Sequence, residues 1–77
     1  MSQVIIYTTP TCTYCNAAKG YFKQNNIAYT EKDVTVDQIA QQDMISKSGQ
    51  MGVPVIDIDG NIVVGFDQAK LKELLKL

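Results

Sequence analysis

Cys12 and Cys15 are the residues of this 77-residue chain whose type and spacing best support chemistry. Residues at i and i+3 at the start of a helix share a face, so their α-carbons can approach the roughly 5.5 Å that a disulfide prefers. Free N–H groups and the positive end of the helix dipole stabilise a thiolate there, and they lower the thiol pKa below its free value of about 8.5. The pattern predicts a redox-active dithiol.

The two thiols are expected to play different roles. Cys12, at the tip of the predicted helix, is expected to attack a substrate disulfide and form a mixed disulfide. Cys15, one turn inside and less exposed, is expected to resolve that intermediate. Lys19 lies a further turn along the same face, where we expect a solvated side chain rather than a source of positive potential for the site.

Other uses of the two cysteines are constrained by composition. The chain has no histidine, which excludes Cys–His and Ser–His–Asp catalysis. A zinc site needs two further ligands and could form only between two chains, so we expect no metal site within the chain. Two cysteines are also too few for the disulfide framework of a small secreted protein. A buried pair without chemistry is the remaining structural alternative.

Length and charge limit the class of protein. A chain of 77 residues predicts a single domain, residues 1–77, and 45% hydrophobic with 19% charged residues is typical of a globular one. Seven basic and eight acidic residues give a net charge of −1, which favours neither nucleic acid nor an anionic membrane as a partner. No apolar run approaches the roughly 20 residues of a membrane span, and no secretion signal is visible. We expect a cytoplasmic monomer without a tightly bound cofactor.

The cysteines lie where a predicted strand passes into a predicted helix. The β-branched and aromatic run Val4–Tyr7 predicts a strand buried on both faces, and Pro10 breaks it. A helical pattern follows over Thr13–Asn25. Residues 27–34 predict a second, partly exposed strand, which should lie parallel to the first because a helix connects them.

The next helix is expected to begin with a capping box. Thr35 is placed as its N-cap with Gln38 completing the box, and Val34 and Ile39 would form the hydrophobic staple around it. The helix should continue to about Lys47, where the pair Ser-Gly ends it.

The C-terminal third predicts a hairpin and a last helix. Two apolar runs, residues 53–58 and 61–64, flank the pair Asp59-Gly60, which supplies the positive φ angles of a tight turn. Asp67 is expected to cap the final helix, with Phe66 stapled onto Leu71. The order is therefore βαβαββα, an α/β chain.

The dithiol, the pair Val53–Pro54 and the segment Gly65–Asp67 together resemble the glutaredoxins, in the same order and over essentially the whole chain. The resemblance implies a thioredoxin-like fold with a four-stranded mixed sheet and three helices. It also implies a cis peptide bond before Pro54, whereas position alone favours trans, because only about 5–6% of X–Pro bonds are cis. Glutathione would then lie beside Tyr14, paired with the Val53 backbone.

In that family the glycine and the acidic helix start receive the γ-glutamyl end of glutathione, a role that the resemblance gives to Gly65, Phe66 and Asp67. The chain departs from the family pattern at Thr13, which replaces a proline, at Thr9, which replaces a lysine, and at Gln68, which replaces an aspartate. Val64 likewise replaces the first of the two glycines that the family has before the last helix. Each change removes a glutathione contact or its close backbone approach.

Three hypotheses follow for the function. The first is a glutaredoxin-like enzyme that reduces protein disulfides or glutathione mixed disulfides and is recharged by glutathione. The second is a redoxin of the same fold that thioredoxin reductase recharges and that donates electrons to ribonucleotide reductase or a similar enzyme. The third is a non-catalytic dimer that holds a metal cluster through Cys12.

Overall fold

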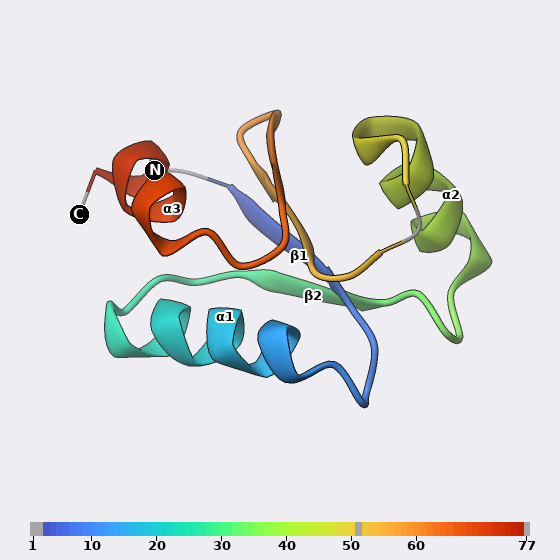
Figure 1. The fold of residues 1–77 in the computed structure, drawn as a ribbon, viewed down its shortest axis with the longest axis horizontal. Helices are drawn as coiled ribbons and strands as arrows, with labels where there is room; N and C mark the ends of the chain where they lie inside the picture. Colours follow the sequence, from blue (N-terminus) through green and yellow to red (C-terminus); the bar gives the residue numbers. More distant parts are fainter. Residues whose placement is uncertain (1–2, 51, 77) are drawn as a thin grey trace.

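The computed structural model describes residues 3–50 and 52–76, and it has the expected order of strands and helices. The elements are β1 (Val4–Thr8), α1 (Thr13–Gln24), β2 (Thr30–Asp33), α2 (Gln38–Ser48), β3 (Val55–Ile58), β4 (Asn61–Val64) and α3 (Gln68–Leu75). Figure 1 shows α2 on the opposite side of β1 from α1 and α3. Within the described residues, no helix is both long and apolar enough to cross a membrane.

The four strands form one mixed sheet in the order β2-β1-β3-β4. β1 pairs in parallel with β2 and antiparallel with β3, and β3 pairs antiparallel with β4. The predicted parallel pairing of the first two strands is confirmed. β1 is thus a central strand, which explains why it lacks polar alternation: Ile6 and Tyr7 point to opposite faces and neither is exposed.

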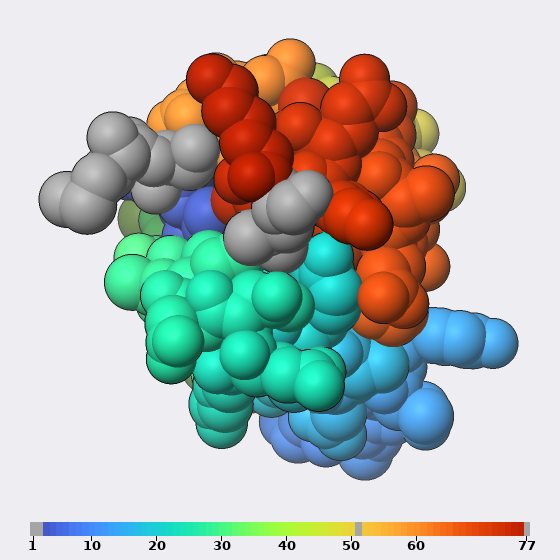
Figure 2. Space-filling view, turned by 90° about the vertical axis from the view of Figure 1, so that its left-hand side faces the viewer, coloured from blue at the N-terminus to red at the C-terminus, as the bar shows by residue number. Residues whose placement is uncertain are grey.

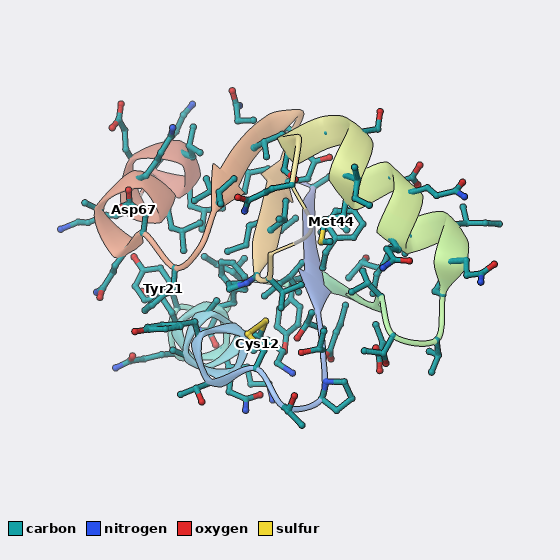
Figure 3. All side chains as sticks on the ribbon, turned by 45° about the vertical axis from the view of Figure 1, so that its right-hand side comes forward. Cys12, Tyr21, Met44 and Asp67 are labelled. Carbon is teal, nitrogen blue, oxygen red and sulfur yellow. A yellow bond between two sulfur atoms is a disulfide. The ribbon has the colours of Figure 1, made fainter. Side chains whose placement is uncertain are left out.

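Helices cover both faces of the sheet, and a separate apolar cluster fills each side. On the α1–α3 face the cluster consists of Val4, Ile6, Ala18, Phe22, Ile56, Ile58, Val63 and Leu71. On the α2 face it consists of Tyr7, Val34, Ala40, Met44 and Val55. Figure 2 shows α3, in red, packed close to α1, in cyan, and Figure 3 shows Met44 reaching from α2 toward β1.

The start of α2 corrects the predicted capping box. Asp37, not Thr35, is the N-cap, and its side chain accepts a hydrogen bond from the Ala40 N–H at 3.0 Å. Thr35 instead donates its N–H and its hydroxyl to the Asp33 carboxylate, so it belongs to the turn that ends β2. The expected staple fails with the cap, because Ile39 is 73% exposed. The helix ends at Ser48, and Gly49 follows with a φ of 74°.

Two strands begin later than predicted. The Ile27 N–H donates to the Phe22 carbonyl at 2.8 Å, which ties the start of the expected strand to the end of α1, and β2 begins only at Thr30. Similarly, β3 begins at Val55, and the preceding Val53–Pro54 bond is cis. That bond is the one implied by the family resemblance and not by position alone.

The C-terminal predictions of the turn and the cap are confirmed. Asp59 and Gly60 have φ angles of 51° and 92°, the left-handed values that the tight turn requires. Asp67 caps α3 by accepting the Lys70 N–H at 3.1 Å. Phe66 packs against the cluster that contains the fully buried Leu71.

Candidate dithiol active site

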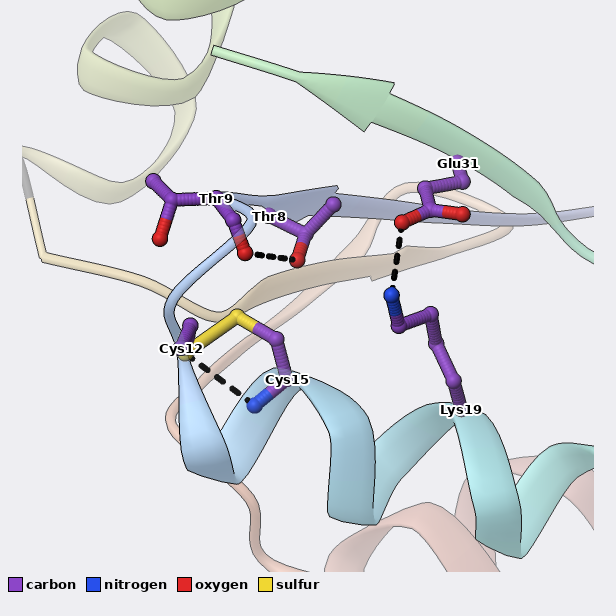
Figure 4. Close-up of a disulfide and its surroundings, with 6 residues drawn as sticks. All are labelled: Thr8, Thr9, Cys12, Cys15, Lys19 and Glu31. Atoms are coloured by element: carbon purple, nitrogen blue, oxygen red, sulfur yellow. Dashed lines mark hydrogen bonds and ion pairs between the residues drawn. A yellow bond between two sulfur atoms is a disulfide. The ribbon is translucent and has the colours of Figure 1, made fainter. Parts of the chain in front are cut away.

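A disulfide joins Cys12 and Cys15 at the N-terminus of α1, with α-carbons 5.2 Å apart (Figure 4). Cys12 is the N-cap of the helix, and its Sγ accepts a hydrogen bond from the Cys15 N–H at 3.1 Å. The Cys12 backbone is held as well, since its N–H donates to the Thr9 carbonyl at 3.3 Å and its carbonyl accepts the Asn16 N–H. Sequence spacing predicted this proximity, and it is confirmed.

The surroundings of Cys12 Sγ favour negative charge on that atom. The sulfur occupies the place of the oxygen that usually caps a helix, facing N–H groups that have no partner within the helix. The first turn of α1 carries no acidic side chain that would offset the positive end of the dipole. When the disulfide is reduced, this arrangement stabilises a thiolate at Cys12.

The two sulfur-bearing residues differ in access. Cys15 is fully buried among the core side chains, whereas Cys12 is partly exposed. An incoming disulfide therefore meets Cys12 first. Tyr14, between them in the sequence, is 68% exposed and projects beside the pair on the first turn of α1.

Three strand ends meet at the end of the sheet from which the chain passes to the dithiol. The β1–β3 register pairs Tyr7 with Val55, so Pro54 follows alongside Thr8, the last residue of β1. The Gly65 N–H donates to the Pro54 carbonyl at 2.8 Å and extends the β3–β4 ladder by one residue. Thr8, Pro54 and Gly65 thus form a row across the end of the sheet, and Thr8 lies four residues before Cys12 in the sequence.

The structure brings the remaining predicted residues to the same end of the sheet. Gly65 has a φ of 79°, a left-handed value that turns the chain from β4 toward α3. Phe66 and Asp67 follow at once, and Asp67 is exposed at the tip of α3 (Figure 3). Val53, which directly precedes Pro54, is half-buried against the cluster on the α2 face.

Lys19 is not directed at the disulfide. Its ammonium forms an ion pair with Glu31 of β2 at 2.7 Å, as Figure 4 shows. The Lys19 side chain is only 19% exposed, so the expectation of a solvated lysine is wrong. We also expected that Lys19 adds no positive potential to the dithiol site. The ion pair agrees with this expectation, because the Glu31 carboxylate offsets the charge of Lys19.

Two features near the site went unnoticed in the sequence. Thr8 is a buried polar residue, 1% exposed, whose hydroxyl donates to the Thr9 carbonyl at 3.3 Å, close to the disulfide in Figure 4. Tyr21 of α1 contacts Phe66 edge-on, with ring centroids 6.0 Å apart. The only sequence signal for Tyr21 was its place on the apolar face of α1. That place does not indicate a contact with Phe66, 45 residues further along the chain.

A second polar group lies on the α2 face. Lys47 donates to Asp57 at 2.8 Å and to the Tyr7 hydroxyl at 2.9 Å, and the Gly60 N–H donates to the other Asp57 oxygen. The hydrogen bonds to Asp57 and to Tyr7 raise the pKa of Lys47. Burial alone would raise the pKa of Asp57, but the bonds from Lys47 and Gly60 outweigh it and keep that pKa below its ordinary value.

Metal-ligating side chains do not gather near either polar group. Within residues 3–50 and 52–76, no group of three or more cysteine, aspartate or glutamate side chains is placed to hold an ion.

Comparison with known proteins gives consistent matches. The sequence model of the Glutaredoxin family matches residues 4–63, which include the cysteine pair and the Val53–Pro54 bond and stop before Gly65. An uncharacterised glutaredoxin-like 8.6 kDa protein from the rubredoxin operon of Clostridium pasteurianum is 46% identical over 71 residues, which cover 92% of this chain and 95% of that protein. Glutaredoxin 3 of Escherichia coli K12 is 34% identical and shares 87% of this chain and 81% of its own.

Among solved structures, a mutant of the thioredoxin-like protein BC3987 superimposes with a TM-score of 0.91 at 36% identity, covering 99% of this chain and 97% of that one. This match confirms the thioredoxin-like fold with its four-stranded mixed sheet and three helices.

Proposed function

The chain belongs to the glutaredoxin family, whose members are thiol–disulfide oxidoreductases, and we propose that it reduces protein disulfides and glutathione mixed disulfides with Cys12 as nucleophile and Cys15 as resolving thiol. The single observation that carries the proposal is the cap geometry: the sulfur of the accessible cysteine accepts an N–H at the tip of α1, while its partner is fully buried. Accessibility and thiolate stabilisation thus favour the same sulfur atom.

The reaction balances within the dithiol. The Cys12 thiolate attacks one sulfur of a substrate disulfide, forms a mixed disulfide and expels the other half as a thiolate, which takes up a proton. Cys15 then loses its proton and attacks Cys12 Sγ, which expels the second half of the substrate as a thiolate. Two electrons pass to the substrate, and the protein returns to the disulfide state described above.

The binding residues are proposed from the family resemblance and from their places at one end of the sheet and at the starts of α1 and α3. The Val53 backbone, beside cis Pro54, would pair with the backbone of the bound thiol, and Tyr14 would cover it. Gly65, Phe66 and Asp67 would receive the γ-glutamyl end of glutathione: the start of α3 suits the carboxylate, and the Asp67 carboxylate suits the amino group.

Cysteine variants test the division of roles. Cys12→Ser should abolish reduction of every disulfide, because no thiolate remains at the helix tip. Cys15→Ser should accumulate mixed disulfides with protein substrates but keep turnover on a glutathionylated peptide, where glutathione can resolve the intermediate. Activity in Cys12→Ser together with a dead Cys15→Ser would reverse the assignment.

A second candidate recharging route, thioredoxin reductase, is favoured by a specific observation. The described segments around the site, residues 8–18, 52–56 and 61–66, contain no charged residue, and Thr9 stands where the family usually has a lysine. The carboxylates of glutathione would find no cation in these segments.

An assay with both donors separates the two routes. The oxidised protein is mixed with either glutathione and its reductase or thioredoxin reductase, each with NADPH, and consumption of NADPH is followed with a protein disulfide as final acceptor. Turnover with glutathione supports the first route, and turnover only with thioredoxin reductase replaces it by the second. Silence with both donors, for a protein that dithiothreitol still reduces, would exclude both.

A further inference from the structure

Tyr21 connects α1, the helix that carries the dithiol, to Gly65–Asp67, the segment proposed to bind the γ-glutamyl end of glutathione. Its ring meets Phe66 edge-on, with an interplanar angle of 64° and centroids 6.0 Å apart. Figure 3 shows Tyr21 between α1 and the beginning of α3, where Asp67 lies. Both rings are partly buried against the cluster on the α1–α3 face. Edge-on pairs of this kind are attractive beyond the area they bury.

The segment that Phe66 belongs to has only a short attachment to the sheet. Gly65 is bound to Pro54 by one hydrogen bond and then leaves the ladder with a positive φ. The next residue that a helix fixes is the N-cap Asp67, whose side chain accepts the Lys70 N–H and whose carbonyl accepts the Leu71 N–H. Between those points the Phe66 side chain is what packs inward, since Asp67 is exposed. The contact between Tyr21 and Phe66 therefore ties the middle of this segment directly to α1.

We propose that Tyr21 is a positioning residue: through Phe66 it fixes the Gly65–Asp67 segment relative to Cys12 and so determines affinity for disulfides that carry a γ-glutamyl group. Because Cys12 caps the same helix from which Tyr21 projects, one rigid element holds both the reacting sulfur and the anchor of the binding segment. The identity of the ligand in this inference rests on the proposed function. The mechanical link from Tyr21 through Phe66 to Gly65 is independent of it.

The kinetic test compares two leucine variants that remove one aromatic ring each from the same cluster. Tyr21→Leu removes the ring that touches Phe66, and Tyr29→Leu removes a ring that instead pairs with Phe22, at 5.4 Å. Each reduced protein is mixed with increasing concentrations of a glutathionylated peptide in single turnovers. A second series uses 5,5′-dithiobis(2-nitrobenzoate), a disulfide that has no γ-glutamyl group.

Tyr21→Leu should raise the half-saturating concentration of the glutathionylated peptide roughly two- to tenfold, the factor that corresponds to the strength of an aromatic pair. Its limiting rate, and its rate with the nitrobenzoate disulfide, should stay at the wild-type values. Tyr21→Phe, which keeps the edge-on ring, should restore wild-type saturation, and Tyr29→Leu should not alter it. An unchanged half-saturation in Tyr21→Leu, or an equal rise in Tyr29→Leu, would overturn the proposal.

Amide exchange reads the mechanical link without any substrate. In Tyr21→Leu the Gly65 N–H should exchange faster, relative to the core amide of Ile6, than it does in Tyr29→Leu. If the wild type fails to reduce the glutathionylated peptide but Gly65 responds as stated, then the proposed function fails and the positioning role stands. If Gly65 exchanges alike in the two variants, the positioning role is wrong whatever the peptide does.

Discussion

The two faces of the sheet are closed by different kinds of contact. On the α1–α3 face, the cluster is made of aliphatic and aromatic side chains, and it holds the two helices whose N-termini carry Cys12 and Asp67. On the α2 face, a smaller apolar cluster lies next to the hydrogen-bonded group of Lys47, Asp57 and Tyr7. The face that positions the dithiol therefore depends on packing, whereas the opposite face depends also on directional, ionisable bonds.

The difference has a consequence for how each face responds to change. Apolar packing is insensitive to pH but loses much free energy when a large side chain is removed, because the cavity closes only in part. A partly exposed network of charged groups loses less free energy of unfolding when one of its members is removed. Its contribution to stability varies with the protonation of those groups. The dithiol thus lies on the face whose buried cluster is apolar, and the ion pair on that side, Lys19–Glu31, is partly exposed.

The largest expected effect comes from the centre of the packed face. Phe22 is fully buried and meets both Tyr21 and Tyr29, so Phe22→Ala should lower the free energy of unfolding by about 3–5 kcal/mol. Urea denaturation at neutral pH measures it, with Tyr21→Phe as a control that keeps the packing. A loss below about 1 kcal/mol would mean that packing does not dominate this face.

The polar group on the other face should give a smaller loss. Lys47→Met removes the cation from Asp57, which is 8% exposed, and should cost about 1–3 kcal/mol because a buried carboxylate keeps only the Gly60 N–H. The Lys47 side chain is about one-third exposed, so water can partly replace it beside Asp57, and this limits the loss of stability. The matched control, Lys72→Met on the exposed side of α3, should change stability by less than about 0.5 kcal/mol. Equal effects of the two substitutions would remove the contrast between the faces.

The same contrast explains what the sequence could and could not predict. Periodicity and turn residues were sufficient for the order of strands and helices along the chain, the Asp59-Gly60 turn and the Asp67 cap, because each depends on neighbours in the chain. The Cys12–Cys15 pair was predictable for the same reason. The cap of α2 was placed wrongly, since Thr35 had a second local partner in Asp33 that the capping-box pattern ignores.

Features that depend on distant parts of the chain were not predictable from pattern. In the sequence, Lys47 lies at the end of one predicted helix and Asp57 lies in a predicted strand of the hairpin. Only the fold brings the Lys47 ammonium to 2.8 Å from the Asp57 carboxylate. The Tyr21–Phe66 contact joins residues 45 positions apart. The cis Val53–Pro54 bond came from family resemblance, because nothing in the local residues favours it.

The pH dependence of stability should come from the α2 face. The pKa of Asp57 is lowered in the folded state, so its ionised form adds stability above the ordinary carboxyl pKa of about 3.9 and loses it as the pH falls through the folded value. The pKa of Lys47 is raised, so its contribution is complete below about 10.4 and declines only as the pH rises through the folded value. The difference in unfolding free energy between wild type and Asp57→Asn should therefore shrink as the pH falls from about 6 to 3. A difference that stays constant over this range would show that the ionised pair contributes nothing beyond its shape.

The smallest expected effect concerns the ion pair on the α1–α3 side. Lys19→Gln should lower stability by only about 0.2–1 kcal/mol, because Glu31 is 44% exposed and solvent screens the pair, and the loss should fall further at high salt. Its effect on the dithiol is the sharper measurement. Since the Lys19 ammonium is directed at Glu31, thiol titration by absorbance should give the same Cys12 pKa in Lys19→Gln as in the wild type. The matched variant is Glu31→Gln, which releases the Lys19 ammonium from its carboxylate partner. If Glu31→Gln lowers the Cys12 pKa and Lys19→Gln raises it, then Lys19 acts on the Cys12 sulfur. The α1–α3 face would then be under ionic control as well.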